Sequence, residues 1–282
     1  MKKLLLAITL LSVLYGCKTV PLTGRKQMIL IPATTMNSLA ASSFEEVRST
    51  SKLSTNVEQT AMIKRVGERI KKAVEEYMAS INRSSDLKGF QWEFILIEDP
   101  TINAWCMPGG KVAFYTGILP VCKDEAGVAV VMGHEIAHAL ANHGAERMSL
   151  ALVQQMGGIA IGVAMSEQPE TTQALAMTAF GVGSTVFGTL PHSRRNEYEA
   201  DRLGMIFMAM AGYDPNEAPK FWERMMALSG NKSSSDFLST HPANEKRITE
   251  LKKRIPEAMR YYKPQSTPPT PTPKTPTRII RN

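Results

Sequence analysis

The sequence has 282 residues, of which 43% are hydrophobic, so it is long and apolar enough to form a folded core. Its formal charge is +7, but six of the positive charges lie in the first three residues and in residues 263–282. The rest carries only +1, which argues against a nucleic-acid-binding protein, because such proteins need a basic face on their folded part.

The N-terminus has the layout of an export signal. Two lysines precede the apolar run 4–14, which is too short to span a bilayer. The run leads into Tyr15-Gly16-Cys17, which resembles a lipoprotein signal, in which cleavage before the cysteine frees it for acylation. An ordinary signal followed by an incidental cysteine is the alternative. We expect a signal peptide over residues 1–16 and a lipid on Cys17.

The next part of the chain predicts a lead-in, a helix and a small sheet. Residues 17–50 are expected to form an N-terminal lead-in that begins with polar, proline- and glycine-containing sequence. Apolar residues at helical spacing predict a helix over 56–77. Aromatic and β-branched residues over 90–97, 102–107 and 111–115, separated by turn sequences, predict three strands in a small antiparallel meander.

The remaining elements are predicted to be helical. A helix over 124–143 is followed by Gly144, which suits a left-handed cap. Polar residues interrupt segment 149–188, so closely packed small-residue helices are expected there rather than a membrane span. Further helices are expected over 194–210, after Asp214-Pro215, and from Pro242 onward. The fold class is therefore α+β, mainly α, with the folded domain over 51–262 and a Pro/Thr-rich disordered tail over 263–282.

The main chemical signal is His134-Glu135-Ile136-Ala137-His138. On a helix, residues four apart share a face, so His134 and His138 can bind one metal ion. Zinc suits these ligands and lowers the pKa of a bound water to about 7. Glu135 is close enough to take the proton of that water as it attacks a carbonyl. His143 is out of register with the pair and is expected to cap the helix rather than bind the metal.

A third protein ligand is expected from the segment 197–201. Glu197 and Asp201 lie four residues apart on one helix face. One can bind the metal while the other accepts a hydrogen bond from a ligand histidine and fixes its tautomer. The spacing leaves the two roles interchangeable. Glu199 points elsewhere and is expected to be solvated or in a salt bridge.

Four segments, which occur in the same order as in the family, make the sequence similar to the HtpX and CAAX-prenyl-protease family of zinc metallopeptidases. The similarity is greatest to the periplasmic lipoprotein branch that includes BepA and LoiP. They are residues 103–110, 133–138, 197–201 and 239–242 with Arg247, and they span most of residues 56–254. Residues 21–25 also resemble the lipoprotein members.

The resemblance implies a zincin-like domain with an active-site helix and one Zn²⁺ per chain. It implies that Glu197 is the third ligand, that Asp201 supports a ligand histidine and that Arg247 lies near the site. His241 is implied to reach the metal centre, where it either stabilises the oxyanion or occupies the open coordination position and holds the enzyme inactive.

The resemblance also implies a substrate-binding strand and a cellular role. Proteases commonly bind substrate along an open sheet edge, and the strand that contains Asn103, Ala104, Trp105 and Cys106 is implied to serve this purpose. The implied activity is zinc-dependent endopeptidase, with misfolded or unassembled envelope proteins as substrates, on the periplasmic face of a bacterial outer membrane.

Three alternatives stay open at this point. The protein could act chiefly as an assembly chaperone or scaffold with a gated, mostly silent zinc site. An integral-membrane prenyl-type protease would need true membrane spans. Cys106 and Cys122 could form a disulfide or remain two buried thiols.

Overall fold

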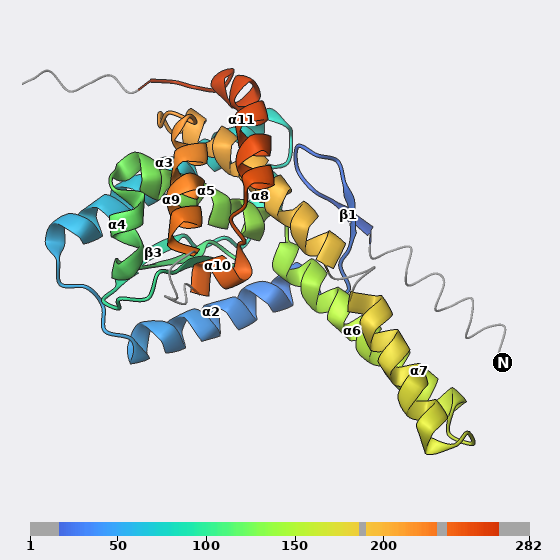
Figure 1. Ribbon diagram of the computed structural model, residues 1–282. Coiled ribbons are helices and arrows are strands. Elements are labelled where there is room, and N and C mark those ends of the chain that lie inside the picture. The colour runs from blue at the N-terminus through green and yellow to red at the C-terminus, as the bar shows by residue number, and fades with distance from the viewer. Residues whose placement is uncertain (1–16, 186–189, 230–235, 265–282) are drawn as a thin grey trace, which may run out of the picture.

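The computed structural model describes residues 17–185, 190–229 and 236–264 (Figure 1). The expected signal peptide and nearly all of the expected tail lie outside the described residues. Helices dominate, and they accompany one two-stranded and one three-stranded sheet. This arrangement confirms the predicted α+β, mainly helical class.

The lead-in has more regular structure than its composition suggests. Strands β1 (Cys17–Thr19) and β2 (Lys26–Met28) pair antiparallel as a hairpin. Helix α2 (Ala33–Thr50) follows, and it buries Met36, Ala40 and Phe44, which lie four residues apart on one face. The next helix, α3 (Val57–Ser80), matches the predicted one, and the side chain of Asn56 caps it by accepting from the backbone N–H of Gln59 at 3.0 Å.

The three-stranded sheet differs from the predicted meander. After the short 3₁₀ helix η1 (Ser84–Leu87) come β3 (Glu93–Ile97), β4 (Ala104–Met107) and β5 (Lys111–Tyr115), in the spatial order β3-β5-β4. Only β4 and β5 are antiparallel, while β3 and β5 run parallel. Beyond the strand ends, the carbonyl of Asp99 accepts from the N–H of Gly117 at 3.0 Å and its N–H donates to the hydroxyl of Thr116 at 3.0 Å. These bonds hold the ends of β3 and β5 together.

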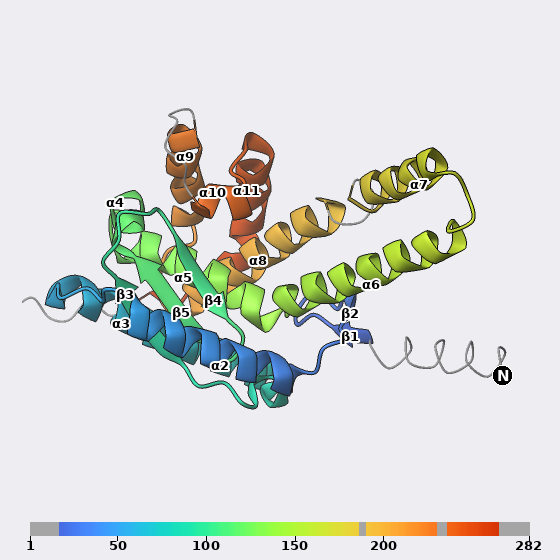
Figure 2. The same cartoon turned by 90° about the horizontal axis from the view of Figure 1, so that it is seen from below.

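Each face of this sheet is covered by helices. Phe94, Leu96, Val112 and Phe114 belong to the main core, on the side of α3 and the zinc-motif helix α5 (Glu125–Leu140). The alternate residues Ile95, Ile97 and Ala113 pack with Phe44 of α2 in a second cluster. Figure 2 shows α2 lying across this second face. The strand β4 is left at the edge of the sheet beside α5.

The helices of the second half follow in order. They are α4 (Leu119–Cys122, after the 3₁₀ turn η2, Thr116–Ile118), α5, α6 (His143–Ala164), α7 (Glu170–Gly183), α8 (Leu190–Met210), α9 (Glu217–Ser229), α10 (Asp236–Thr240) and α11 (Glu245–Met259).

Several helix boundaries differ from the prediction, and two of them bear on the site or its surroundings. Helix α5 ends at Leu140, because Asn142, and not Gly144, takes the left-handed conformation with φ of 56°. His143 therefore opens α6 instead of capping α5. The predicted helix start at Pro242 is also wrong: α11 begins at Glu245, and Asn244 caps it.

Two glycines allow α5 and α8 to cross at very short range. A Cβ atom added to Gly133 would lie 2.8 Å from the carbonyl oxygen of Gly204, and one added to Gly204 would lie 2.8 Å from the backbone nitrogen of His134. Any side chain here would push the helices apart. The close crossing brings residues 197–201 of α8 next to the histidines of α5.

Helices α6 and α7 extend from the body as a hairpin (Figures 1 and 2). They pack closely where Gly157 faces Phe180, since an added Cβ would lie 2.7 Å from the ring. Along the hairpin many large apolar side chains are exposed, including Met156, Val163 and Leu175. Among the described residues, none of the helices is both long enough and apolar enough to cross a lipid bilayer. Cys106 and Cys122 are both free thiols.

Candidate metal centre

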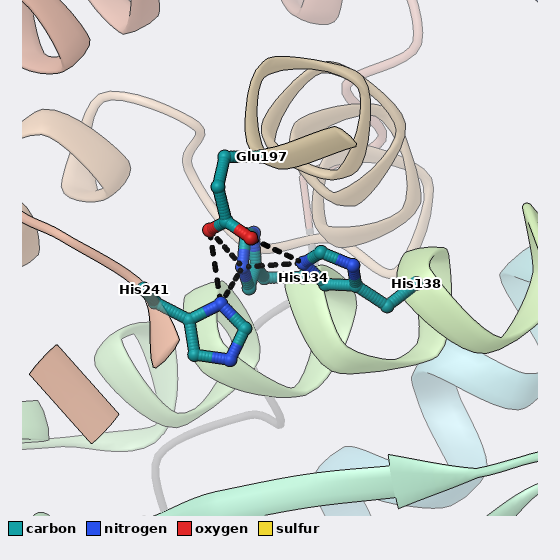
Figure 3. Close-up of side chains that lie close together, drawn as sticks. All are labelled: His134, His138, Glu197 and His241. Carbon is teal, nitrogen blue, oxygen red and sulfur yellow. Dashed lines mark hydrogen bonds and ion pairs between the residues drawn. The ribbon is translucent and has the colours of Figure 1, made fainter. Parts of the chain in front are cut away.

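Four side chains from three segments converge on one point (Figure 3). Nε2 of His134 lies 3.1 Å from Nε2 of His138 and 3.2 Å from Nδ1 of His241, which follows α10. Glu197 of α8 places Oε1 3.3 Å from Nε2 of His138. Its other oxygen, Oε2, lies 3.4 Å from Nε2 of His134 and 2.9 Å from Nδ1 of His241.

These separations fit a tetrahedral zinc ion. Ligand atoms placed about 2.05 Å from such an ion lie about 3.3 Å from one another. The contacts of His134 with His138 and His241, and of Glu197 with all three histidines, run from 2.9 to 3.4 Å, with Oε1 of Glu197 facing His138 and Oε2 facing the other two. The four ligand atoms all lie within 4.8 Å of one another. Imidazole and carboxylate are also ligands that zinc accepts readily. The cluster therefore has both the donors and the spacing that a zinc site needs.

Asp201 and Arg247 support the cluster from behind His134. Oδ1 of Asp201 lies 3.0 Å from Nδ1 of His134, the nitrogen that faces away from the cluster. Arg247 donates to both oxygens of Asp201, at 2.8 and 2.7 Å, and its Nη1 lies 3.1 Å from Oε2 of Glu197. Its guanidinium also lies over the ring of Trp222, 3.4 Å from the ring centre. Arg247 is 1% exposed, so these contacts hold it in one position.

Glu135 lies beside the cluster without joining it. It is 4% exposed, and its Oε1 is buried without a hydrogen-bond partner among the described residues. Nε2 of His241 lies 3.4 Å from that oxygen, close enough for electrostatic attraction but without hydrogen-bond geometry. Burial raises the pKa of Glu135 above its ordinary value. A buried carboxylate with a raised pKa suits a group that accepts a proton from water.

The charges of the ligand residues depend on their neighbours. Burial alone would lower the pKa of His134, but its hydrogen bonds to Asp201 and Glu197 outweigh burial and raise that pKa to about 9. Burial dominates at His138 and lowers its pKa well below the ordinary value. Burial would raise the pKa of Glu197, but the surrounding histidines hold it well below the ordinary value. The anionic carboxylate makes the cluster attractive to a cation.

A pocket of about 920 Å³ opens beside the cluster. Residues 103–107, which include all of β4, line it together with Glu135, His138 and His241. Asn103, Ala104, Trp105 and Cys106, the residues of the predicted substrate strand, thus lie along the same pocket as the candidate metal ligands.

A polar network that the sequence patterns do not predict lies behind His138. His143 is 5% exposed and its Nδ1 lies 2.8 Å from Nδ1 of His138. Glu199 is buried, not solvated, and forms a salt bridge with Arg25 at 2.8 Å, the second of the two states expected for it. Burial would raise the pKa of Glu199, but hydrogen bonds from His143, Arg25 and Thr23 lower it to about 2. The only sequence signal for Arg25 was the resemblance of residues 21–25 to lipoprotein members.

The sequence is similar to those of known peptidases. Residues 65–255, more than half of the chain, match the family described as peptidase family M48. The chain is 41% identical over 180 residues to the mitochondrial metalloendopeptidase OMA1 of Schizosaccharomyces pombe, covering 64% of this chain and 50% of the relative. It is 28% identical over 264 residues to the OMA1 metalloendopeptidase of Homo sapiens, covering 90% and 48%.

A bacterial relative is also similar. The beta-barrel assembly-enhancing protease of Escherichia coli is 31% identical over 171 residues, which cover 58% of this chain and 34% of that protein. The chain thus spans about half the length of the OMA1 proteins and about a third of the bacterial relative. The matched region contains His134, His138 and Glu197, together with Asp201, which contacts His134, and Arg247, which contacts Glu197. The chain belongs to peptidase family M48.

Proposed function

We propose that this protein is a zinc-dependent endopeptidase that cleaves unfolded or unassembled polypeptides. The observation that carries the proposal is the convergence of His134, His138 and Glu197 at zinc-ligand spacing, with the carboxylate of Glu135 buried beside them. The printed names of the relatives, metalloendopeptidase and beta-barrel assembly-enhancing protease, support the same class of reaction.

In the proposed reaction, zinc supplies polarisation and the protein's own residues supply proton transfer and ligand positioning. Zinc held by His134, His138 and Glu197 would polarise a substrate carbonyl and lower the pKa of a nearby water molecule to about 7. Glu135 accepts a proton from that water as the water oxygen bonds to the carbonyl carbon. Glu135 then donates the proton to the amide nitrogen as the carbon–nitrogen bond breaks. Asp201 keeps the His134 proton on Nδ1, so that Nε2 stays a ligand.

The edge strand β4 supports a mode of substrate binding. Among the described residues β4 pairs with β5 alone, and residues 103–107 line the pocket. An extended peptide can add to such an edge through main-chain hydrogen bonds, which hold any sequence. This mode suits an enzyme whose substrates share an unfolded state rather than one cleavage motif.

His241 supports a gated site. Its Nδ1 completes the cluster of four ligand atoms, so in this conformation it fills the position that a substrate carbonyl or water needs. We expect His241→Ala to retain stoichiometric zinc and to cleave casein about 10-fold faster, because a ligand worth about 1.4 kcal/mol of competition is removed. A fall in the rate with zinc retained would favour the oxyanion role instead, and loss of zinc would make His241 an essential ligand.

The position of His241 at the metal centre also bears on the chaperone alternative. A protein that holds clients while His241 closes the metal centre would bind unfolded chains and rarely cleave them. Casein that is bound but left intact by the wild type, and cleaved by His241→Ala, would place the protein in that class.

Metal removal tests the proposed reaction directly. Treatment with 1,10-phenanthroline should abolish casein cleavage, and added zinc should restore it, because only the bound cation makes a water acidic enough for Glu135 to activate at neutral pH. Cleavage that persists in the chelated protein, with zinc absent by elemental analysis, would rule out this chemistry.

We also propose that the chain is a lipoprotein of a bacterial envelope, anchored through Cys17 and facing the periplasm at the outer membrane. The support is the charge-then-apolar order of residues 1–14 followed by Cys17, and the similarity to the E. coli protease. Envelope protein quality control would follow from that location. Cys17→Ser should move the protein from the membrane fraction to the soluble fraction; an unchanged distribution would exclude the lipid anchor.

A further inference from the structure

A chain of buried polar contacts leads from His138 away from the ligand cluster. Nδ1 of His138 lies 2.8 Å from Nδ1 of His143, and Nε2 of His143 lies 3.1 Å from Oε2 of Glu199. His143 and Glu199 are 5% and 6% exposed. Neither takes part in the hydrolysis proposed above, and burying such groups is costly unless their polar atoms are paired.

Hydrogen-bond chemistry allows one arrangement of protons along this chain when His138 binds a metal through Nε2. Glu199 pairs with Arg25, so it is a carboxylate and only accepts. His143 then donates from Nε2, and as a neutral imidazole it has only Nδ1 left as an acceptor. His138 therefore donates from Nδ1 and keeps the lone pair of Nε2. A cationic His143 would place the His138 proton on Nε2, where it would block metal binding.

Arg25 fixes the end of this series of hydrogen bonds that lies farthest from His138. Its Nε donates to Oε2 of Glu199 at 2.9 Å, and Nη1 and Nη2 donate to the carboxylate of Glu146 at 2.6 and 2.9 Å. Thr23 also donates to Glu199. Both Thr23 and Arg25 lie in the turn that joins β1 to β2. The region matched by the family begins only at residue 65, so this turn lies outside it.

His134, the other ligand histidine, has a comparable set of supporting contacts. Behind His134, Asp201 accepts from Nδ1 and Arg247 holds the carboxylate. Supporting partners of this kind fix the tautomer and the ring orientation of a metal-binding histidine. On the His138 side, a second imidazole is inserted between the ligand and the carboxylate.

We propose that Arg25, Glu199 and His143 form a positioning relay through which the β1–β2 hairpin sets the tautomer and orientation of His138. The proposal rests on the proposed zinc endopeptidase function, because His138 needs a free Nε2 lone pair only if it binds a metal. If the relay exists, the turn between β1 and β2 influences metal affinity, although it lies more than 100 residues before the zinc motif.

Zinc affinity, measured by competition with a chromophoric chelator, tests the relay without relying on activity. His143→Leu should weaken zinc binding about 10–100-fold, the usual effect of removing such a supporting partner. His143→Asn should recover most of the loss, because its amide oxygen can accept from His138 where Nδ1 did. Arg25→Ala should weaken binding in the same range. Lys26→Ala, a change at an exposed residue of the same hairpin, should not.

A double-variant cycle separates a relay from two unrelated structural effects. Residues that act in series do not add, so Arg25→Ala combined with His143→Leu should bind zinc no more weakly than the worse single variant. Thermal unfolding of each metal-free variant shows whether the fold is intact. If the fold is lost, ¹⁵N NMR of the zinc-loaded wild type replaces the cycle: it should show the proton on Nδ1 of His138 and on Nε2 of His143.

The outcomes separate the relay from the function on which it rests. A wild type that binds no zinc would defeat the proposed function itself. A wild type that binds zinc, beside a folded His143→Leu variant with affinity within about twofold of it, would overturn the relay alone. Fully additive losses in the cycle, or His138 protonated on Nε2 in the zinc-loaded protein, would overturn it as well.

Discussion

Glu135→Gln is expected to lower the rate of casein cleavage at least about 1,000-fold while zinc binding stays stoichiometric. General acid–base catalysis contributes about 10²–10⁴-fold, and here one carboxylate both accepts the proton of water and returns it to the leaving amine. The amide of glutamine has nearly the same size but accepts a proton poorly. Glu135 makes none of the short contacts within the ligand cluster, so the metal should remain bound.

The measurement compares initial rates of the wild type, Glu135→Gln and the control Glu170→Gln, an exposed glutamate of α7, at matched zinc content. The control should retain full activity. If Glu135→Gln cleaved casein at the wild-type rate, another group would have to be the base, and the burial of Glu135 Oε1 without a hydrogen bond from the described residues would need a different explanation.

The second large effect is expected at Glu197. Glu197→Ala removes a carboxylate that lies within 3.4 Å of the ligand nitrogens of both His134 and His138, so the purified protein should lose its zinc. Asp201→Asn is the matched comparison, because it changes the other carboxylate on the same helix face. Among the candidate ligands, Asp201 contacts His134 at the rear nitrogen, so this variant should bind zinc about 10–100-fold more weakly but not lose it.

Elemental analysis after dialysis, followed by chelator competition, gives both values. The order of the two effects matters more than their size. A greater loss of zinc in Asp201→Asn than in Glu197→Ala would exchange the two roles, which the i, i+4 spacing by itself leaves open.

The parts of the site that could be predicted from sequence are those carried by helical periodicity. His134 and His138 share a face because they lie four residues apart, and the same holds for Glu197 and Asp201. These residues share a face in any α-helix, so the pairing follows from sequence without the tertiary structure. Which carboxylate faces the histidines depends on how α5 crosses α8, and that crossing is set by Gly133 and Gly204 in three dimensions.

The parts that could not be predicted depend on contacts between distant segments. The parallel pairing of β3 with β5 is a long-range contact, accompanied by hydrogen bonds between Asp99 and residues Thr116 and Gly117, that leaves no periodic pattern in the sequence. The position of His143 depends on a single left-handed residue, Asn142, where glycine was the expected cap. Arg25 reaches Glu199 across more than 170 positions of sequence, and a polar turn gives no sign of its partner.

The central claim is that side chains of α5 and α8 bind one zinc ion. X-ray absorption spectroscopy on the purified protein, combined with its metal content, tests this most directly. We expect one zinc per chain with nitrogen and oxygen ligands at about 2.0–2.1 Å, at least two of them imidazoles. Protein that stays free of zinc after reconstitution, or zinc whose ligands include no histidine, would contradict the account.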